Sequence, residues 1–164
     1  MPSSVTQRTP ARRCGFTLIE ILVVVVILGI LATVVTTSFA NAGMQASQTA
    51  FATDLRTFVD ACEYARMRDG VYPADTSSGV YPPELAASVT PGEWVGGTPV
   101  GGVWDTELND SGVSAAVGVH FNGVGETRDD AYMAEVDAII DDGDVTNGVF
   151  QRLAAGRYYW ILEP

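Results

Sequence analysis

Glu20 is the residue that most needs a chemical explanation, because it is a carboxylic acid at the start of a long apolar run. Residues 21–53 contain no charged side chain, and residues 21–35 are almost wholly Ile, Leu and Val. An ionisable group in a membrane helix costs about 2.5–3.5 kcal/mol at the bilayer centre and less toward the interface, and it usually marks a functional site. We therefore expect Glu20 to have a polar partner; the alternative is a tolerated, neutral acid at the interface.

A second group of candidate ligands lies in the sequence DDGDVTNG, which begins at Asp141. Asp141, Asp142, Asp144 and Asn147 cluster hard oxygen donors around Gly143, as a calcium loop requires. Their order differs from the EF-hand pattern, which has D-x-[DN]-x-[DN]-G and a later Glu. These four residues are a candidate structural calcium site. The alternative is an Asp-rich helix exit in which Gly143 is the cap.

Residues suited to enzyme chemistry are scarce. The chain has one histidine, His120, so a metal site built from several histidines is impossible, and no motif supports a Ser-His-Asp arrangement. Cys62 lies far from His120 in the sequence, and no Cys-His pair is expected. No glycine-rich loop precedes a predicted helix as a phosphate-binding loop does. We expect no catalytic residues and predict that the protein is not an enzyme.

The charge balance is strongly acidic. Twenty Asp and Glu face nine Arg and no Lys, so the net charge is −11 at neutral pH. Arg8, Arg12 and Arg13 precede the apolar run, and without them six Arg face the same twenty acids, a net charge near −14. Such a surface repels phosphate backbones, so no direct nucleic-acid partner is expected. It suits a cell exterior or the binding of divalent cations.

The apolar run is long enough to cross a membrane. Residues 16–35 make about 20 helical residues, which span roughly the 30 Å of a hydrocarbon core. The arginines before them place the N-terminus in the cytoplasm and the residues after about 40 outside. A secretory signal peptide cut after Ala42 is an alternative, but its apolar region would be about twice the usual length and would contain Glu20. A lipoprotein signal at Cys14 would need the apolar stretch before the cysteine, whereas here it follows.

The helical pattern continues beyond the membrane. Five residues recur at spacings of four, three, four and three and make one apolar stripe: Phe51, Leu55, Phe58, Cys62 and Ala65. No proline occurs between residues 16 and 70, and Gly70 is a suitable C-cap. We expect one long helix over residues 16–70, with its membrane-spanning part at about 16–37.

Residues 71–164 are predicted to form a small globular head. A turn-rich connector, with Tyr-Pro twice, leads to a short helix near residues 83–89. Two strands at 98–108 and 112–121 are joined by the turn NDSG. A helix at 128–142 follows.

The pattern of that helix places four side chains inward: Tyr132, Val136, Ile139 and Ile140. The chain then forms a predicted hairpin of strands at 148–153 and 156–163, which turns around Ala154 and Ala155. The last strand is apolar on both faces, so we expect it inside the sheet. The predicted fold class is α+β, a long N-terminal helix packed on a small antiparallel sheet.

The sequence Gly15-Phe16-Thr17-Leu18-Ile19-Glu20 follows a short basic leader and opens the apolar helix. It resembles the prepilin cleavage signature of the type IV pilin and type II secretion pseudopilin superfamily. The resemblance implies that a prepilin peptidase removes the leader at residues 1–15, by cutting between Gly15 and Phe16, and that Phe16 is then N-methylated. The new α-amine of Phe16 becomes the candidate partner of Glu20, either about one turn away in the same chain or in a neighbouring subunit. The resemblance favours the neighbouring subunit.

The resemblance also implies a function. The expected protein is a structural subunit that polymerises through its N-terminal helix into a type II secretion pseudopilus or a type IV pilus. Its expected partners are further copies of itself or minor pilins, the prepilin peptidase, the inner-membrane assembly platform and membrane lipid. Before assembly it would cross the inner membrane once, with its N-terminus in the cytoplasm and its head in the periplasm or outside the cell.

Two alternatives remain at this point. One is a membrane-anchored extracytoplasmic binding or enzymatic domain that does not polymerise, although a mere anchor gains nothing from Glu20. The other is a DNA-uptake (competence) pilin, which the acidic charge disfavours as a direct DNA binder. The Tyr-Pro connector favours the secretion pseudopilus slightly.

Overall fold

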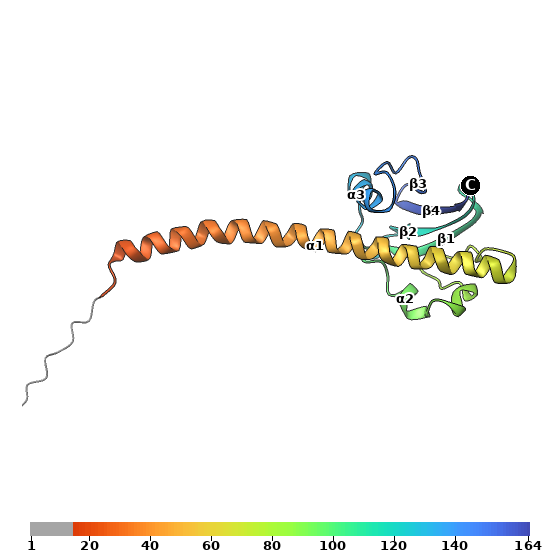
Figure 1. Ribbon diagram of the computed structural model, residues 1–164, viewed down its shortest axis with the longest axis horizontal. Coiled ribbons are helices and arrows are strands. Elements are labelled where there is room, and N and C mark those ends of the chain that lie inside the picture. Colours follow the sequence, from red (N-terminus) through yellow and green to blue (C-terminus); the bar gives the residue numbers. More distant parts are fainter. Residues whose placement is uncertain (1–14) are drawn as a thin grey trace, which may run out of the picture. The chain divides into compact units, whose positions relative to one another are not determined.

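The computed structural model describes residues 15–164, so the leader expected at residues 1–15 lies outside this range apart from Gly15. The elements follow one another in the order α1 (Leu18–Asp69), η1 (Pro83–Ala87), α2 (Pro91–Val95), β1 (Val103–Asp110), β2 (Val113–His120), α3 (Asp130–Ile140), β3 (Phe150–Ala154) and β4 (Arg157–Glu163) (Figure 1). This confirms the predicted α+β class. Residues up to Asn41 and residues from Ala42 onward form two compact units.

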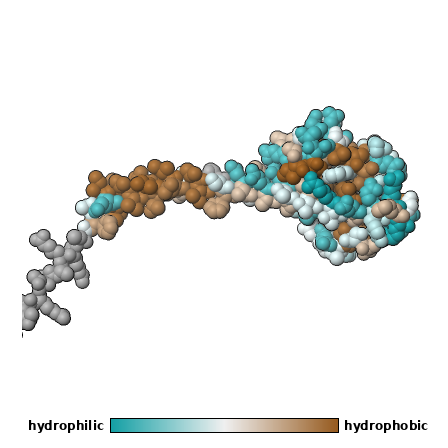
Figure 2. Space-filling model, in the orientation of Figure 1, coloured by the Kyte–Doolittle hydropathy of each residue, from teal (hydrophilic) through white to brown (hydrophobic). Residues whose placement is uncertain are grey.

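In the first unit, α1 has an almost continuous apolar surface. Every large apolar side chain from Phe16 to Val35 has about half or more of its surface exposed, and Figure 2 shows this stretch as one hydrophobic band. Among the described residues, α1 is the helix that is long and apolar enough to cross a membrane, judged by length and composition. The membrane-spanning segment at residues 16–37 stays a prediction that this surface supports.

In the second unit, the later part of α1 packs on the sheet (Figure 1). The five residues of the predicted stripe are between 0% and 4% exposed, which confirms the stripe. Phe51 stacks on Trp104 of β1, with ring centroids 5.2 Å apart. Phe58 meets Trp104 edge-on at 4.6 Å. Such aromatic pairs add about 0.5–1.5 kcal/mol beyond their buried area, so they bind helix and sheet firmly together.

The four strands form one antiparallel sheet in the order β1-β2-β4-β3. The prediction that the last strand lies inside the sheet is therefore confirmed. Gly118 permits the close approach of β4 to β2, because a Cβ atom at this position would lie 2.1 Å from the carbonyl oxygen of Tyr158.

Glycines with positive φ set several element ends. Gly70 has φ +80° and donates its N–H to the carbonyl of Arg66 at 2.8 Å, which confirms it as the cap of α1. The first strand was predicted from residue 98, but β1 begins at Val103. Gly101 and Gly102 have φ of +95° and +73°, which breaks the extended backbone before the strand.

The two hairpin turns also differ slightly from expectation. β1 continues to Asp110, and the turn residues are Ser111 and Gly112, whose φ values of +53° and +87° fit a two-residue type I′ turn. The turn between β3 and β4 lies at Ala155 and Gly156 rather than around Ala154 and Ala155, because Gly156 supplies the positive φ of +69°.

The inward face of α3 was predicted incorrectly in part. Met133, Val136 and Asp137 are buried, whereas Ile139 is 38% exposed. Tyr132 and Ile140 are partly buried against the core. A pattern that counts only apolar residues could not place Asp137 inside, since it treats every Asp as a solvent-facing residue.

Both edges of the sheet are bonded to loops. Along β1, the N–H of Gly79 donates to the carbonyl of Trp104 at 2.8 Å, and Oγ1 of Thr106 donates to the carbonyl of Ala74 at 3.0 Å. Along β3, the N–H of Arg152 donates to the carbonyl of Val145 at 2.7 Å. The two backbone contacts take up one group on each strand edge that could otherwise pair with a strand from another chain.

Candidate functional site

Thr17 and Glu20 form a capping box at the amino end of α1. Oε2 of Glu20 accepts hydrogen bonds from the backbone N–H and the hydroxyl of Thr17, at 2.8 and 2.7 Å. In return, the N–H of Glu20 donates to Oγ1 of Thr17 at 3.3 Å. This reciprocal arrangement satisfies the N–H of Thr17 and adds to the bond of 3.1 Å that the N–H of Glu20 makes to the carbonyl of Thr17. Glu20 thus has a local role, which the T-x-x-E pattern before an apolar run could have revealed from the sequence.

The remaining part of the Glu20 carboxylate lies in an apolar setting. Glu20 lines a shallow hollow on the helix together with Phe16, Ile19, Val23 and Val24. Within the described residues Oε1 of Glu20 accepts no hydrogen bond, and no basic side chain forms an ion pair with it. One carboxylate oxygen therefore stays available for a cation presented by another molecule.

The bond between Gly15 and Phe16 lies before the start of the helix. The backbone from Gly15 to Thr17 has no regular secondary structure, and α1 begins at Leu18. Phe16 is 79% exposed, and a Cβ atom on Gly15 would meet nothing within 4 Å. A protease could therefore reach this bond without unwinding α1.

The comparison with known families agrees with this picture. Residues 10–36 match the family model described as the prokaryotic N-terminal methylation motif. The chain carries the type IV pilin and pseudopilin signature. The methylation motif covers Gly15, Phe16 and Glu20 and ends within α1, so it does not extend to the head. No curated protein and no solved structure matches the chain significantly.

The methylation motif has consequences for processing and location. It implies a prepilin peptidase as a partner and a pilus assembly context in general. Together with the apolar α1 it fits a membrane-anchored pilin. Proteins with this motif are structural subunits rather than enzymes.

In the acidic loop after α3, the structure brings together a different set from the one expected. One carboxylate oxygen from each of Asp137, Asp141 and Asp142 lies within 4.8 Å of the others. Asp144 instead accepts hydrogen bonds from the N–H and hydroxyl of Thr146, at 3.0 and 2.6 Å, and from the Asn147 amide at 3.4 Å. The loop therefore holds two of the four predicted ligands and adds Asp137, which the sequence pattern had missed.

A buried polar network on β1 and β4 was also missed. Oδ2 of Asp105 accepts hydrogen bonds from the hydroxyls of Tyr159 at 2.8 Å and Ser78 at 2.9 Å. Nη1 of Arg157 lies 3.6 Å from the same oxygen and also pairs with Oε1 of Glu107. Burial raises the pKa of Asp105, and the two hydroxyls and Arg157 offset part of that rise. The network follows from strand register, which is not visible in the sequence.

This network brings Ser78, His120 and Asp105 together, yet not as a catalytic triad. Ser78 Oγ lies 2.7 Å from Nδ1 of His120, and Asp105 Oδ2 lies 3.8 Å from the same nitrogen. In a triad the serine and the aspartate contact opposite ring nitrogens, so that the histidine can move a proton between them. Here Ser78 donates directly to Asp105, and His120 acts as a structural member of the network. Burial lowers the pKa of His120, which keeps the imidazole neutral at pH 7.

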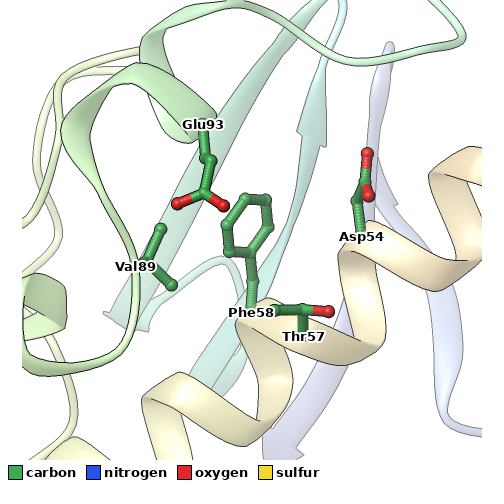
Figure 3. A pocket seen from close by; sticks show the side chains of 5 residues that line it. All are labelled: Asp54, Thr57, Phe58, Val89 and Glu93. Carbon is green, nitrogen blue, oxygen red and sulfur yellow. The ribbon is translucent and has the colours of Figure 1, made fainter.

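A further pocket lies between α1 and the residues around α2, where Asp54 and Glu93 provide two carboxylates beside Phe58 (Figure 3). Two neighbouring acids could in principle work as an acid–base pair. However, Oε2 of Glu93 accepts hydrogen bonds from the N–H and hydroxyl of Thr90, both at 2.7 Å, in the capping box of α2. Glu93 thus caps the amino end of α2, and the pocket is explained by the packing of α1 against the residues around α2.

Proposed function

We propose that this protein is a structural subunit of a type II secretion pseudopilus or a type IV pilus. After cleavage between Gly15 and Phe16 and N-methylation of Phe16, copies of the chain would polymerise through the apolar surface of α1. The methylation motif at residues 10–36 is the observation that carries this proposal. It is supported by the exposed apolar side chains of α1, which need either lipid or other helices around them.

Glu20 has a defined part in the proposed assembly. Glu20 lines an apolar hollow, its Oε1 accepts no hydrogen bond within the described residues, and its Oε2 is held by Thr17. The α-amine of Phe16 from a neighbouring subunit can pair with Oε1 without breaking the capping box. In surroundings of low dielectric such an attraction is stronger than in water, although desolvation offsets part of it. The pair would fix the axial register between neighbouring helices.

This proposal is preferred over a non-polymerising anchor, because an anchor has no use for a carboxylate directed to lipid. A DNA-uptake pilin shares the same N-terminal chemistry. Its head would contact DNA poorly in this case, since residues 42–164 contain nineteen acidic and six basic residues. The acidic head is compatible with a secretion pseudopilus, which needs no nucleic-acid contact.

Substitution of Glu20 by Ala tests the assembly role. We expect the Glu20→Ala chain to insert and to be cleaved, but to give at least about tenfold fewer filaments, since a lost charge pair of roughly 1.4 kcal/mol per contact lowers each association tenfold. Intact-mass measurement checks cleavage and methylation, and electron microscopy of sheared filaments checks assembly. Thr17→Ala is the matched control: it removes the capping hydroxyl, leaves Glu20 in place and should retain filaments. Filaments at the wild-type level from Glu20→Ala would refute the role of Glu20.

Deletion of the gene in its host then separates the two kinds of machine. Loss of proteins from the culture medium, measured by mass spectrometry, identifies a secretion pseudopilus. Loss of surface filaments with secretion unchanged identifies a type IV pilus. If neither changes, the proposed function is wrong.

A further inference from the structure

We propose that the fold makes Asn122 a site of spontaneous deamidation, in which the peptide nitrogen of Gly123 attacks the side-chain amide. The reacting pair, Asn122 and Gly123, lies between β2 and α3, in a segment whose residues 122–127 are all exposed. A bond forms from the Gly123 nitrogen to Cγ of Asn122, and the bond from Cγ to Nδ2 breaks. Ammonia leaves with the proton of the Gly123 N–H, and the product is a cyclic succinimide. Water then opens the ring at either carbonyl and gives aspartate or isoaspartate.

The space around the attacking nitrogen is open. Glycine hinders this attack least, because it has no side chain beside the nitrogen. Gly123 has φ +90°, and a Cβ atom at this position would meet nothing within 4 Å. Both the ring and the water that hydrolyses it therefore have room to form and to enter.

The reacting pair lies between two fixed points of the backbone. Before it, the N–H of Phe121 donates to the carbonyl of Gly156 at 2.8 Å. After it, the carbonyl of Val124 accepts the N–H of Gly102 at 3.0 Å. Within residues 15–164, the backbone groups of the reacting pair itself make no hydrogen bond. The pair can therefore change conformation toward the ring without breaking a backbone hydrogen bond of the fold.

The side-chain amide of Asn122 is prepared for attack. Its Oδ1 accepts the backbone N–H of Val124 at 3.2 Å. Attack at Cγ places negative charge on Oδ1, and a donor already aimed at that oxygen stabilises the charge, as in an oxyanion hole. The next acid along the chain, Glu126, pairs with Arg128 at 2.6 Å, which limits its repulsion of this charge.

The second Asn-Gly pair of the chain, at Asn147 and Gly148, provides an internal contrast, since valine follows the glycine in both pairs. Asn147 donates its N–H and its Nδ2 to Asp144, at 2.9 and 3.4 Å. A Cβ atom on Gly148 would lie 2.0 Å from Oδ2 of Asp141, so a carboxylate packs directly against this peptide. Its negative charge opposes loss of the Gly148 proton and the growth of charge on the amide oxygen. Asn122 should therefore react faster.

The two products change the segment in different ways. Aspartate keeps an oxygen where Oδ1 lies, so the bond from the N–H of Val124 is retained. Isoaspartate directs the backbone through the former side chain, which adds a methylene group and removes this acceptor. Either product adds a negative charge to a head whose residues 42–164 already contain nineteen acidic and six basic side chains. Heads would thus gain charge with age, whether or not the chain polymerises.

Timed incubation of the full-length protein in detergent at mildly alkaline pH tests the proposal. Digestion after glutamate at acidic pH then gives peptides 108–126 and 136–163, which separate Asn122 from Asn147. Mass spectrometry with fragmentation measures the conversion of each amide to acid, and incorporation of heavy oxygen from labelled water shows that the ring was hydrolysed. A protein carboxyl methyltransferase detects isoaspartate. In the folded protein Asn122 should convert at least about tenfold faster than Asn147, a small part of what a donor to a developing oxyanion contributes in an enzyme.

Unfolding separates the effect of the fold from that of the local sequence. In guanidinium chloride the two asparagines have the same two following residues, so they should convert at similar rates. Asn122→Gln should abolish the fast conversion, because its attack would form a less favoured, larger ring, and should leave Asn147 unchanged. Conversion of Asn122 no faster than that of Asn147 in the folded protein would overturn the proposal. A rate advantage of Asn122 that persists undiminished in guanidinium chloride would overturn it too, since the fold would then have no part in the reaction.

Discussion

Replacement of Arg157 by Met should destabilise the head strongly at neutral pH. Arg157 is the basic residue that pairs with two buried acids, since the side chains of Asp105 and Glu107 are each 2% exposed. Asp105 keeps its hydrogen bonds from Tyr159 and Ser78 after the substitution. Glu107 keeps only a long hydrogen bond of 3.4 Å from Ser111. The free-energy cost of the substitution therefore falls mainly on Glu107, whose buried carboxylate loses its charged partner.

Breaking a buried ion pair from one side costs about 3–5 kcal/mol, and the partial exposure of Arg157, at 29%, favours the lower end. For a head of this size, about 3 kcal/mol corresponds to a fall in Tm of about 12 °C. The residue retains a methylene stem as Met, so packing is largely preserved. Arg157→Met is thus a test of charge rather than of volume.

The loss should also depend on pH. The folded-state pKa of Asp105 is raised by burial, so the stability associated with this group is present below its unfolded pKa and is lost as pH rises through the folded value. Arg157 lowers the pKa of Asp105, so its removal raises that pKa further and makes the loss of stability with rising pH steeper. We expect the difference between wild type and Arg157→Met to be small near pH 4 and to grow toward pH 7. Urea unfolding followed by Trp fluorescence across this range measures it. A difference below about 1 kcal/mol at pH 7, or one independent of pH, would refute the role assigned to the ion pair.

Two further substitutions or reagents test the core. Gly118→Ala should lower the free energy of unfolding by at least about 3 kcal/mol or prevent folding, because its Cβ atom would lie 2.1 Å from the carbonyl oxygen of Tyr158. A Tm within about 2 °C of wild type would contradict the close approach of β2 and β4. Cys62 should resist iodoacetamide at about pH 8 in the folded protein and react after unfolding, since it is 0% exposed and burial raises its pKa to about 12. Peptide mapping locates the label. Equal labelling of the folded and unfolded protein would show that the buried stripe of α1 opens readily.

Features that depend on neighbouring residues in the sequence were predicted well. The long helix, the buried stripe from Phe51 to Ala65 and the inner position of β4 follow from local periodicity and composition, and the structure agrees. The processing signature is likewise a short contiguous motif, and residues 10–36 match its family model. Strand ends were less accurate, because the backbone of Gly101 and Gly102 decides where β1 begins.

Features that depend on contacts between distant residues could not be predicted. Asp105 and Arg157 meet because β1, β2 and β4 pair in one particular register. Asp137 is buried although its residue type favours solvent, and the acids near it become a cluster only when the loop closes. Glu20 is a different case: its bond to Thr17 is local, and the T-x-x-E pattern was available in the sequence.

The loops bonded to the two edges of the sheet matter when many heads lie close together. In the filament we propose, many identical heads lie at a very high local concentration, where an open strand edge could join two sheets in an arrangement that the helices do not control. The residues around Gly79 cover β1, and the loop that carries Val145 covers β3. Loss of either loop contact would open a strand edge and favour disordered aggregation of heads, so the loops would protect the order of the polymer as well as the fold of each subunit.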